Sequence, residues 1–342
     1  MRNTRLIFSA TLVLAAAASP FLARGHEGDG SGRWSTLPVI GTGPVQEHAV
    51  AATSDDLYVI GGIENNVTTS RRDVSAYNFK TSTWRSVAPI PLGLNHPNAV
   101  AVDGKIYVLG GLTGPDGEPV WRYTTACFVY DPDTDEWTTL PSMPEDQGRG
   151  ASAVGVHGPI VYLAGGLRLS YLTGDVFQES VDTVTAYNTR TGEWVRLPPL
   201  PEPRDHVGGA VINSTLFVVG GRDHGYENTK HTTWAMNLHT AERGWVTKSE
   251  MPTARAGIAT GVIDRYIVTF GGEGNPADPS GVFPQSEAYD TESDRWAELG
   301  SMLVPRHGMA AASVGGAIFI AGGGMIRGGA EPSDVFTSFT FA

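Results

Sequence analysis

The stretch WVRLPPLPEPRDHVGGAVINSTLFVVGG, residues 194–221, decides the fold of this 342-residue chain. It begins with a tryptophan and a proline-rich connection, and it ends with two short apolar runs and a glycine pair. The same outline recurs six times: glycine pairs begin at residues 61, 110, 165, 220, 271 and 322, and a tryptophan precedes each pair by 26 to 28 residues. A self-similar period of about 50 residues with paired glycines indicates an array of β-sheet repeats, in which each repeat buries its apolar face against the next.

Each repeat is predicted to hold four short strands. In the second repeat we expect them at residues 98–102, 105–109, 125–131 and 137–140. The second strand of each repeat is apolar on both faces, as a strand between two sheets must be, and we expect the glycine pair to end it. The repeated aromatic residues are predicted to be structural, because they are large, rigid fillers between twisted sheets. They are Tyr77, Tyr130, Tyr187 and Tyr289, with Trp34, Trp84, Trp137, Trp194, Trp245 and Trp296.

The two ends of the chain predict how the array closes. Trp34 starts a segment of the fourth-strand type that has no other strand before it. The sixth repeat, in contrast, stops after a segment of the third-strand type, DVFTSFTF at residues 334–341. We therefore expect residues 34–38 to complete the sixth sheet, so that no strand edge stays open.

These repeats resemble the kelch family, and the resemblance covers the chain from about Trp34 to its end. It implies an all-β, six-bladed kelch β-propeller at residues 34–342, closed by an N-terminal strand that completes the last blade. The functions of the family are diverse. They include binding modules, the propellers of copper radical oxidases similar to galactose oxidase, plant specifier proteins that use iron, and a periplasmic sialic acid mutarotase. No catalytic motif of these proteins matches this sequence.

The residues before the repeats are predicted to direct export. Residues 1–18 carry two arginines, a short apolar run and a string of small residues, which is the pattern of a signal peptide. Residues 19–33 are expected to form a flexible lead-in. The protein is thus predicted to be secreted, or periplasmic if its source is bacterial. Asn66 and Asn213 lie in glycosylation sequons, which are used only in a eukaryote.

Composition narrows the classes of partner. The chain has 36 acidic and 24 basic residues, a formal net charge of −12. Nucleic acid and anionic membrane surfaces are therefore not expected to bind it. No stretch outside the leader approaches the roughly 20 apolar residues of a spanning helix. Cys127, the only cysteine, alternates like a strand residue and is interpreted as a small buried hydrophobe. We expect a monomer that binds a small molecule or a protein ligand.

One face of the predicted propeller carries the long loops. In an up-and-down sheet of four strands, the connection into the first strand and the connection after the second strand emerge on the same face. The connections after the glycine pairs are long and irregular, whereas the turns of the opposite face are short. Long loops in an otherwise economical array usually carry binding. These loops are residues 112–124, 167–182, 222–231, 273–286 and 324–333.

Polar residues gather on this face, at the starts of the first strands and after the glycine pairs. The candidate binding residues are His48, His96, Trp121, Arg149, Arg204, Arg222, Asp223, His224, Arg255, Glu273, Arg306 and His307, and the candidate catalytic residues are Glu47, Asp205 and His206. Because the first strand is innermost in a propeller, these residues are expected to surround the mouth of the central channel. Arginine, histidine and carboxylate together can hold an anionic or polyhydroxylated ligand and can move protons near neutral pH.

His206 is the candidate general acid–base among these residues. Consecutive residues of a strand point to opposite faces, so either Asp205 or His206 should face the ligand unless the strand is bulged. We expect Asp205 or Asp223 to orient other polar groups, and Glu47 to supply a second carboxylate across the mouth. Glu47 and the run 222–224 are not explained by the repeat pattern, which favours a functional role for them.

A structural interpretation competes for other residues. Arg204, Arg255 and Arg306 occupy the same position in three repeats, which favours a role in tying neighbouring sheets together. His96 and His206 also share one register, but two histidines do not make a metal site, and the sequence shows no short-range ligand spacing. No metal and no cofactor are expected.

Two functions remain open from the sequence. The first is an acid–base isomerase, cyclase or mutarotase that acts on a carbohydrate or a secreted metabolite. The second is a secreted protein-interaction module without catalysis. A deep funnel with converging Glu47, Asp205 and His206 would favour catalysis, whereas a plugged channel with a flat, apolar rim would favour partner binding.

Overall fold

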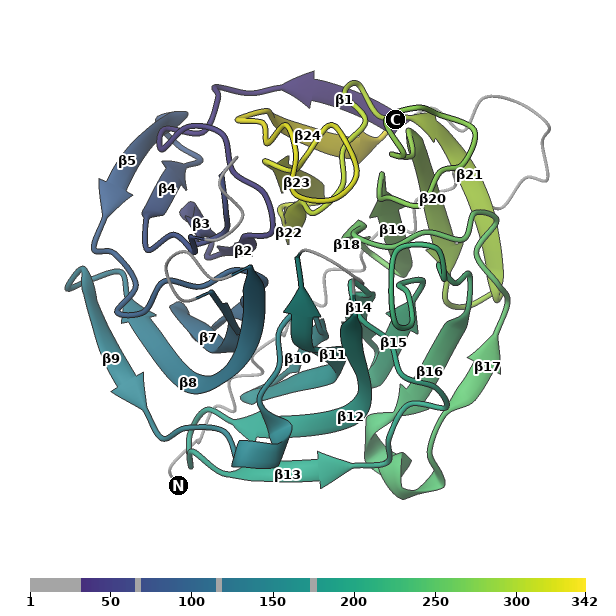
Figure 1. The fold of residues 1–342 in the computed structure, drawn as a ribbon, viewed down its shortest axis with the longest axis horizontal. Helices are drawn as coiled ribbons and strands as arrows, with labels where there is room; N and C mark the ends of the chain where they lie inside the picture. The colour runs from purple at the N-terminus through teal and green to yellow at the C-terminus, as the bar shows by residue number, and fades with distance from the viewer. Residues whose placement is uncertain (1–31, 65–68, 115–118, 173–176) are drawn as a thin grey trace, which may run out of the picture.

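The computed structural model describes residues 32–64, 69–114, 119–172 and 177–342, and their regular secondary structure is almost entirely antiparallel β-sheet. Figure 1 shows the sheets arranged around a central axis like the blades of a propeller. Among the described residues, no helix is long and apolar enough to cross a membrane. The predicted leader and Asn66 lie outside these residues.

The strands group into four-stranded units, numbered here in chain order. Unit 1 holds β2 (Ala49–Ala52), β3 (Asp56–Ile60), β4 (Val74–Asn78) and β5 (Thr83–Val87). Unit 2 holds β6 (Ala99–Val102), β7 (Lys105–Thr113), β8 (Val120–Asp131) and β9 (Glu136–Leu140), and unit 3 holds β10 (Ala153–His157), β11 (Ile160–Tyr171), β12 (Gln178–Asn188) and β13 (Trp194–Leu197). Unit 4 holds β14 (Gly208–Ile212), β15 (Thr215–Val219), β16 (Thr233–Asn237) and β17 (Val246–Lys248).

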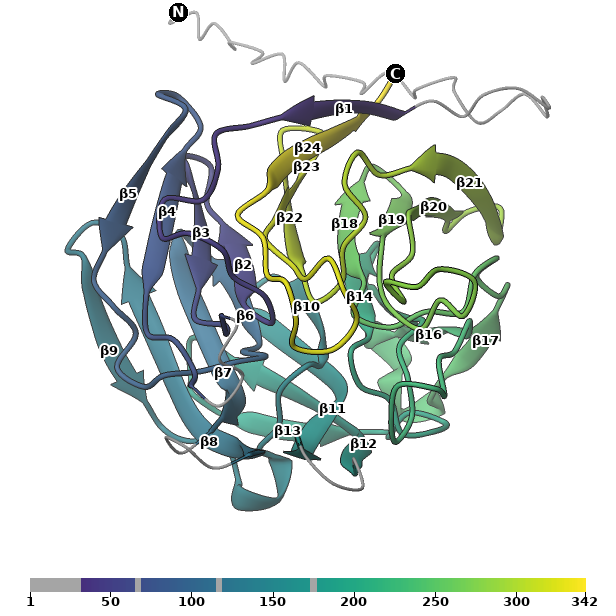
Figure 2. The same ribbon diagram turned by 45° about the horizontal axis from the view of Figure 1, so that its top comes forward.

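The remaining strands follow the same order. Unit 5 holds β18 (Ala259–Ile263), β19 (Tyr266–Phe270), β20 (Gln285–Asp290) and β21 (Arg295–Ser301). Unit 6 holds β22 (Ala310–Val314), β23 (Ala317–Ala321) and β24 (Phe336–Phe341), and β1 (Gly32–Thr36) pairs antiparallel with β24 (Figure 2). Two short 3-10 helices, η2 (Glu145–Gln147) and η3 (Leu238–Arg243), lie in connections. The first strands of neighbouring units contact one another around the axis.

Units 2 and 3 depart from the predicted strand limits. The glycine pairs at 110 and 165 do not end β7 and β11, because each strand passes through its pair at a bulge and continues. The predicted loops 112–124 and 167–182 are therefore largely strand, and β8 pairs with β11 to join the two units into one eight-stranded sheet. Gly110 and Gly165 have φ of 71° and 65°, a conformation that costs glycine little, so a bulge can turn the strand there without breaking it.

A ring of backbone hydrogen bonds encloses one end of the central channel. One residue just ahead of each first strand adopts a left-handed conformation and donates its N–H to the carbonyl of the equivalent residue of the unit before it, over 2.7–3.1 Å. The ring closes on itself, since Glu47 donates to Gly308. Its members are Glu47, His96, Ala151, His206, Gly257 and Gly308, with φ between 49° and 63°. This conformation is uncommon for residues other than glycine.

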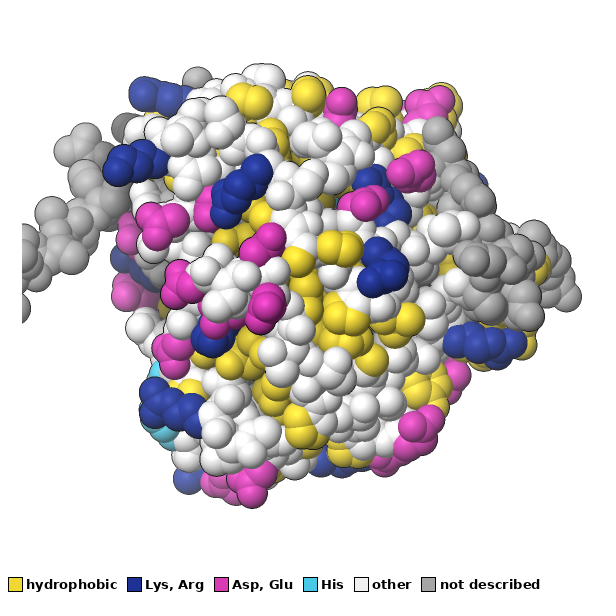
Figure 3. All heavy atoms as spheres, turned by 90° about the vertical axis from the view of Figure 1, so that its left-hand side faces the viewer, with side chains coloured by type: hydrophobic (Ala, Val, Ile, Leu, Met, Phe, Trp, Pro, Cys, Tyr) yellow, Lys and Arg dark blue, Asp and Glu magenta, His cyan; other side chains and the backbone are white. Residues whose placement is uncertain are grey.

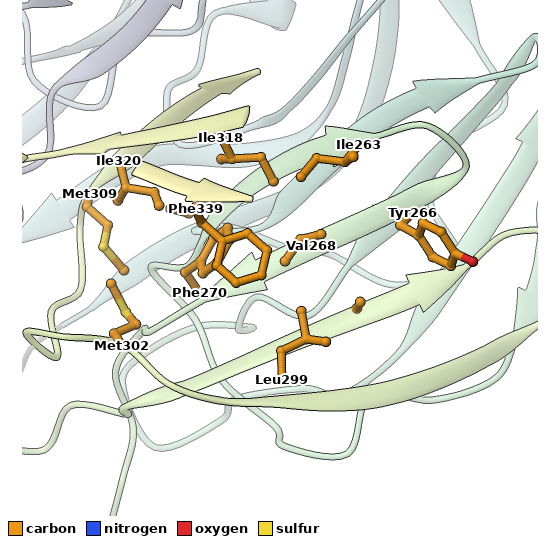
Figure 4. Packing of buried hydrophobic residues seen from close by; sticks show 12 residues of the cluster. Ile263, Tyr266, Val268, Phe270, Leu299, Met302, Met309, Ile318, Ile320 and Phe339 are labelled. Atoms are coloured by element: carbon orange, nitrogen blue, oxygen red, sulfur yellow. The ribbon is translucent and has the colours of Figure 1, made fainter. Parts of the chain in front are cut away.

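Apolar side chains fill the space between neighbouring units. Between units 5 and 6, Phe270 and Phe339 pack edge to face with ring centroids 5.2 Å apart, and Met309 and Ile318 lie beside them (Figure 4). Full burial of each such side chain contributes about 1.5–3 kcal/mol. On the outer surface that forms the left-hand side of Figure 1, side chains of both charges are interspersed among apolar ones (Figure 3).

The repeat tryptophans lie between units, in the structural role that the sequence predicted. Four of them donate the indole N–H to a backbone carbonyl over 2.8–3.1 Å. Trp137, Trp245 and Trp296 donate to Ala88, Pro198 and Ser249 of the preceding unit, and Trp84 donates to Pro38 in the segment that leads into unit 1. Trp194 packs on Tyr187 in the same way that Trp137 packs on Tyr130, but its indole nitrogen has no hydrogen-bond partner among the described residues.

This difference supplies a matched test of the inter-unit hydrogen bond. We expect Trp137→Phe to lower the free energy of unfolding by about 1 kcal/mol more than Trp194→Phe does, because only Trp137 loses a hydrogen bond along with its ring area. Urea unfolding of both variants and the parent measures the difference. Equal losses in the two variants would contradict the assignment.

Candidate functional site

The candidate site is a cluster of buried polar side chains at the ring of backbone hydrogen bonds. In every unit, the residue before the ring residue forms a β-bridge with the residue that follows the glycine pair. Three positions of each unit therefore meet at the channel mouth. In unit 4 they are Asp205, His206 and Arg222, and the main chains of Asp205 and Arg222 exchange two hydrogen bonds of 2.9 Å.

Three side chains from units 1, 2 and 4 converge at one point. Glu47 Oε2 lies 3.0 Å from His96 Nε2 and 3.9 Å from His206 Nε2, and the two Nε2 atoms lie 2.9 Å apart. All three residues belong to the backbone ring, whose left-handed conformation directs these side chains to a common point. One carboxylate oxygen and two imidazole nitrogens within 4.8 Å of one another can hold a metal ion.

The residue before each histidine fixes the orientation of its ring. His206 Nδ1 lies 2.5 Å from Asp205 Oδ1, and His96 Nδ1 lies 2.6 Å from Asn95 Oδ1. Of this pair, His206 lines the channel, whereas the Asp205 carboxylate lies behind the imidazole and orients it; the left-handed φ of 49° at His206 allows this contact between neighbours. Burial, and then the positive charge of Arg222, lower the pKa of His206, which favours its neutral form.

Arg222 links two carboxylates beneath the cluster. Its Nε donates to Asp205 over 3.0 Å, one terminal nitrogen pairs with Glu273, and the other lies 3.1 Å from His206 Nε2. Tyr226 covers the guanidinium, with the ring centroid 4.5 Å from its central carbon. Because two carboxylates bind this guanidinium, its orientation is fixed, and it is pre-organised to donate a further hydrogen bond.

Unit 6 completes the polar side of the cluster. His307 Nδ1 lies 3.5 Å from Glu273 Oε2 and 3.9 Å from Glu47 Oε1, and its Nε2 lies 2.8 Å from the carbonyl of Ile326. The backbone N–H of Gly328 donates to Glu273 over 3.0 Å, so the connection after β23 covers the site.

Buried negative charge dominates the cluster. Glu47, Asp205 and Glu273 are 9%, 0% and 2% exposed, and they face one guanidinium, Arg222. Burial alone would raise the pKa of each carboxyl, but the neighbouring charges outweigh it. Three imidazoles hold the pKa of Glu47 well below its usual range, Arg222 and the adjacent imidazole lower that of Asp205 to about 2, and His307 with Arg222 lowers that of Glu273. Counting the three carboxylates and Arg222 alone, the cluster carries a net charge of about −2, which each imidazole reduces by one when it is protonated.

The cluster separates two spaces. On one side, the central channel encloses about 540 Å³ and is lined largely by small side chains of the first strands, such as Ala99, Gly155 and Ala310. On the other side is a cavity of about 10 Å³ between His206, Arg222 and Trp121. That volume holds about one water molecule. The converging residues that favour catalysis are present, and on the loop side the described residues enclose this small cavity and no deep funnel.

The polar cluster faces an apolar one. Ile63, Leu112 and Leu167 follow the glycine pairs of units 1 to 3 and are wholly buried against Trp121. The Trp121 ring also packs on the imidazole of His96, with centroids 5.0 Å apart. At the position after the glycine pair, the chain is therefore apolar in units 1 to 3 and charged in units 4 and 5.

Four predicted arginines do not reach the cluster. They lie within their own units, wholly buried, and bind main-chain carbonyls and threonine hydroxyls there. In three units, the carbonyl of the first glycine of the pair accepts a hydrogen bond from Arg149, Arg255 or Arg306. The fourth arginine, Arg204, stacks on Trp234, 4.5 Å from the ring centroid. Arg204, Arg255 and Arg306 thus have structural contacts, but these join parts of one unit and not the neighbouring sheets that the sequence interpretation named.

The other predicted residues lie around the cluster. His48 is buried in the channel wall, where burial lowers its pKa to about 4. Asp223 and His224 form an ion pair at the exposed rim. Asn213 lies exposed in the turn between β14 and β15, on the opposite side of its unit.

Sequence reasoning missed three contributors. Ser180 donates to Asp205 from β12, the Gly328 backbone covers Glu273, and Asn95 orients His96. Only Asn95 carried a sequence signal, because it occupies the register of Asp205. The expectation of no metal considered only the two histidines, although the third potential ligand, Glu47, occupies the same register of its own repeat.

We expect loss of Arg222 to destabilise the fold strongly. Arg222→Met leaves Asp205 and Glu273 as buried charges without their partner, which should lower the free energy of unfolding by about 3–5 kcal/mol. Arg327 provides the control, because its side chain is 53% exposed and its ion pair with Glu227 is also exposed. Arg327→Met should change stability by less than about 0.5 kcal/mol. Chemical unfolding at neutral pH checks both, and a small effect at Arg222 would refute the charge balance given above.

Comparisons with known proteins agree with this architecture. A family model described as the KLHDC2/KLHL20/DRC7 Kelch-repeats domain matches residues 30–199 and 168–338. Over 305 residues the chain is 43% identical to the Kelch-like protein terF of Aspergillus terreus, which covers 87% of this chain and 66% of that protein. It is 31% identical over 186 residues to the human Kelch repeat and BTB domain-containing protein 12, which covers 51% of this chain and 29% of that protein.

A plant enzyme is also similar: the N-(sulfonatooxy)prop-2-enimidothioate sulfolyase of Thlaspi arvense is 27% identical over 288 residues, 74% of this chain and 78% of the enzyme. The chain spans less than two-thirds of the length of the terF protein and of the human protein. The repeats, the antiparallel units and the family match lead to one assignment. The chain belongs to the kelch-repeat family of β-propeller proteins.

Proposed function

We propose that the polar cluster is the reactive centre of an enzyme that isomerises or cyclises a small molecule. One observation carries this proposal: the fold does not need the buried charges. The three equivalent positions of unit 3 are Gly150, Ala151 and Leu167, and the backbone ring and bridges form there as in the other units. Buried ionised groups are costly to maintain, and those that a fold does not need usually serve function.

The chemistry of the cluster suits reactions that move a proton. Glu47, His96 and His206 present three acceptor atoms to one point, and Arg222 presents a donor there. Beside them, Glu273 and His307 form a second carboxylate–imidazole pair. Polarisation of a substrate oxygen at this point and transfer of a proton nearby are what an isomerisation or cyclisation requires.

The channel offers the space for a substrate. Glu47, His96 and His206 line its end, and its volume of about 540 Å³ lies within the usual range of small-molecule sites. The small side chains of its wall favour a compact molecule with an oxygen function that reaches the cluster. The excess of carboxylates disfavours an anion, so a neutral metabolite fits better than the anionic ligand that the sequence suggested.

A protein-interaction role is the second candidate. Tyr171 and Phe177 are 42% and 47% exposed and lie together on the extended β11–β12 hairpin, with ring centroids 6.5 Å apart. Exposed aromatic pairs are common anchors of protein interfaces. This patch lies near the rim residue His224, whose ring centroid is 6.4 Å from that of Phe177, and does not use the buried cluster.

A ligand screen with two histidine variants separates these functions. We expect a neutral compound from a set of sugars, sugar acids and aromatic polyketides to raise the melting temperature of the parent and to be converted on incubation. His206→Gln should abolish both effects, whereas His224→Gln at the rim should keep them. Because His206 is only 7% exposed and hydrogen-bonded, its variant should also melt lower, so binding is measured well below the melting temperature. Full ligand affinity in a destabilised His206→Gln would refute the proposal.

We also propose that the ring has six blades and is closed by β1. The pairing of β1 with β24 from Gly32 to Thr36 supports closure, and so does the ring of hydrogen bonds through Glu47 and Gly308. Export by the predicted leader at residues 1–18 remains a prediction from sequence.

Deletion of residues 34–40 tests closure. It should expose the edge of β24, so we expect aggregation or rapid proteolysis. Size-exclusion chromatography and limited proteolysis measure this outcome. A monomeric variant with the parent's melting temperature would contradict closure by this strand.

A further inference from the structure

We propose that Glu47, His96 and His206 together bind one divalent transition-metal ion at the end of the channel. The ligand atoms are Glu47 Oε2, His96 Nε2 and His206 Nε2. The site is the same centre as in the proposed function, but ion binding does not depend on the presence or identity of a substrate. The two proposals can therefore fail separately.

The spacing of the three atoms matches a metal. They are 2.9, 3.0 and 3.9 Å apart, so the point equidistant from them lies about 2.0 Å from each, which is the usual distance from zinc to imidazole nitrogen and carboxylate oxygen. Glu47 Oε2 and His206 Nε2, 3.9 Å apart, would lie on nearly opposite sides of that point, so their side chains have to move closer together for a tetrahedral arrangement.

The hydrogen bonds of the two histidines leave both lone pairs facing this point. Asn95 donates through Nδ2 to Ser70 over 2.7 Å, and in this orientation its Oδ1 accepts from His96 Nδ1. The Asp205 carboxylate likewise accepts from His206 Nδ1. Each neutral ring thus carries its proton on Nδ1 and an unprotonated Nε2. Histidine ligands of metals almost always donate their other ring nitrogen to such an acceptor.

Three acceptor atoms in contact require positive charge between them. Glu47, Asp205 and Glu273 are all buried, and Arg222 is the one buried guanidinium that faces them among the described residues. A divalent ion would neutralise the remaining charge of about −2. Trp121 packs over His96 and limits access of water, which strengthens electrostatic attraction there.

Arg222 and extra protons are the competing sources of positive charge. A terminal nitrogen of Arg222 lies 3.1 Å from His206 Nε2 and donates to its one lone pair, so an ion has to replace this hydrogen bond. It does not reach the contact between His96 and Glu47, where an imidazolium proton is the alternative to an ion. Metal binding therefore has to displace a proton, and its affinity should weaken at acidic pH.

The donor set selects the class of ion. Two imidazoles and one carboxylate suit Zn²⁺, Fe²⁺ and similar transition metals, whereas Mg²⁺ and Ca²⁺ prefer oxygen ligands. The three protein ligands leave at least one coordination position open, and the cavity of about 10 Å³ beside His206 has room for one water-sized ligand.

Titration of the chelator-stripped full chain tests the site. We expect one Zn²⁺ per chain by isothermal titration calorimetry, and Co²⁺ should give the visible absorption of a low-coordinate site. Glu47→Gln and His96→Gln should each weaken Zn²⁺ binding by more than about 100-fold, and Asn95→Ala by about 10-fold through the ring that it orients. His231→Gln is the matched control: its imidazole also lies near a carboxylate, 3.6 Å from Glu250, but both are exposed. It should bind like the parent.

The negative outcomes are equally defined. Binding that is absent from the parent, or unchanged in both Glu47→Gln and His96→Gln, would overturn the proposal. If these variants fold poorly, X-ray absorption of the Zn²⁺-loaded parent decides, since the site requires two imidazole nitrogens and one oxygen at about 2.0 Å. Zn²⁺ binding without any substrate conversion would leave the ion site standing and count against the proposed function alone.

Discussion

The ring of six backbone hydrogen bonds is the constraint on which the site depends. It requires a left-handed residue ahead of every first strand, and glycine meets that requirement at Gly257 and Gly308. At Glu47, His96 and His206 the chain accepts the cost of a non-glycine residue in this conformation, which is of the order of 1 kcal/mol. The ring holds these three side chains at fixed angles, so residues about 50 and 110 positions apart meet within hydrogen-bonding distance.

The second physical feature is that adjacent charged residues have different surroundings. Arg204 lies within its own unit and binds Pro203, Glu202 and Thr232, whereas Asp205 and His206, its immediate successors, belong to the cluster. Arg222 has the opposite role: it follows a glycine pair and holds two buried carboxylates. Arg204 thus has only structural contacts, whereas Arg222 of the same unit belongs to the polar cluster.

The structure also explains why the mouth is both polar and closed. Units 1 to 3 contribute Ile63, Leu112 and Leu167 after their glycine pairs, and units 4 and 5 contribute Arg222 and Glu273 at the same position. The connection containing Gly328 covers the charged residues from unit 6. This burial agrees with the proposed reactive centre, because a molecule in the channel can reach the cluster whereas a macromolecule cannot contact it directly.

The sequence by itself determined the repeat, the four strands of each unit, the structural tryptophans and the shared register of His96 and His206, because each depends on local periodicity or on spacing that every repeat preserves. It also singled out Glu47 and Asp205 as residues that could join them. Only the tertiary structure decided that the glycine pairs at 110 and 165 bend their strands without ending them, that Asp205 lies behind the His206 imidazole and orients it, and that Ser180 and Gly328 complete the cluster. These features depend on a left-handed turn and on contacts between units. Neither follows from a repeating pattern of residues, so neither could be predicted from the sequence.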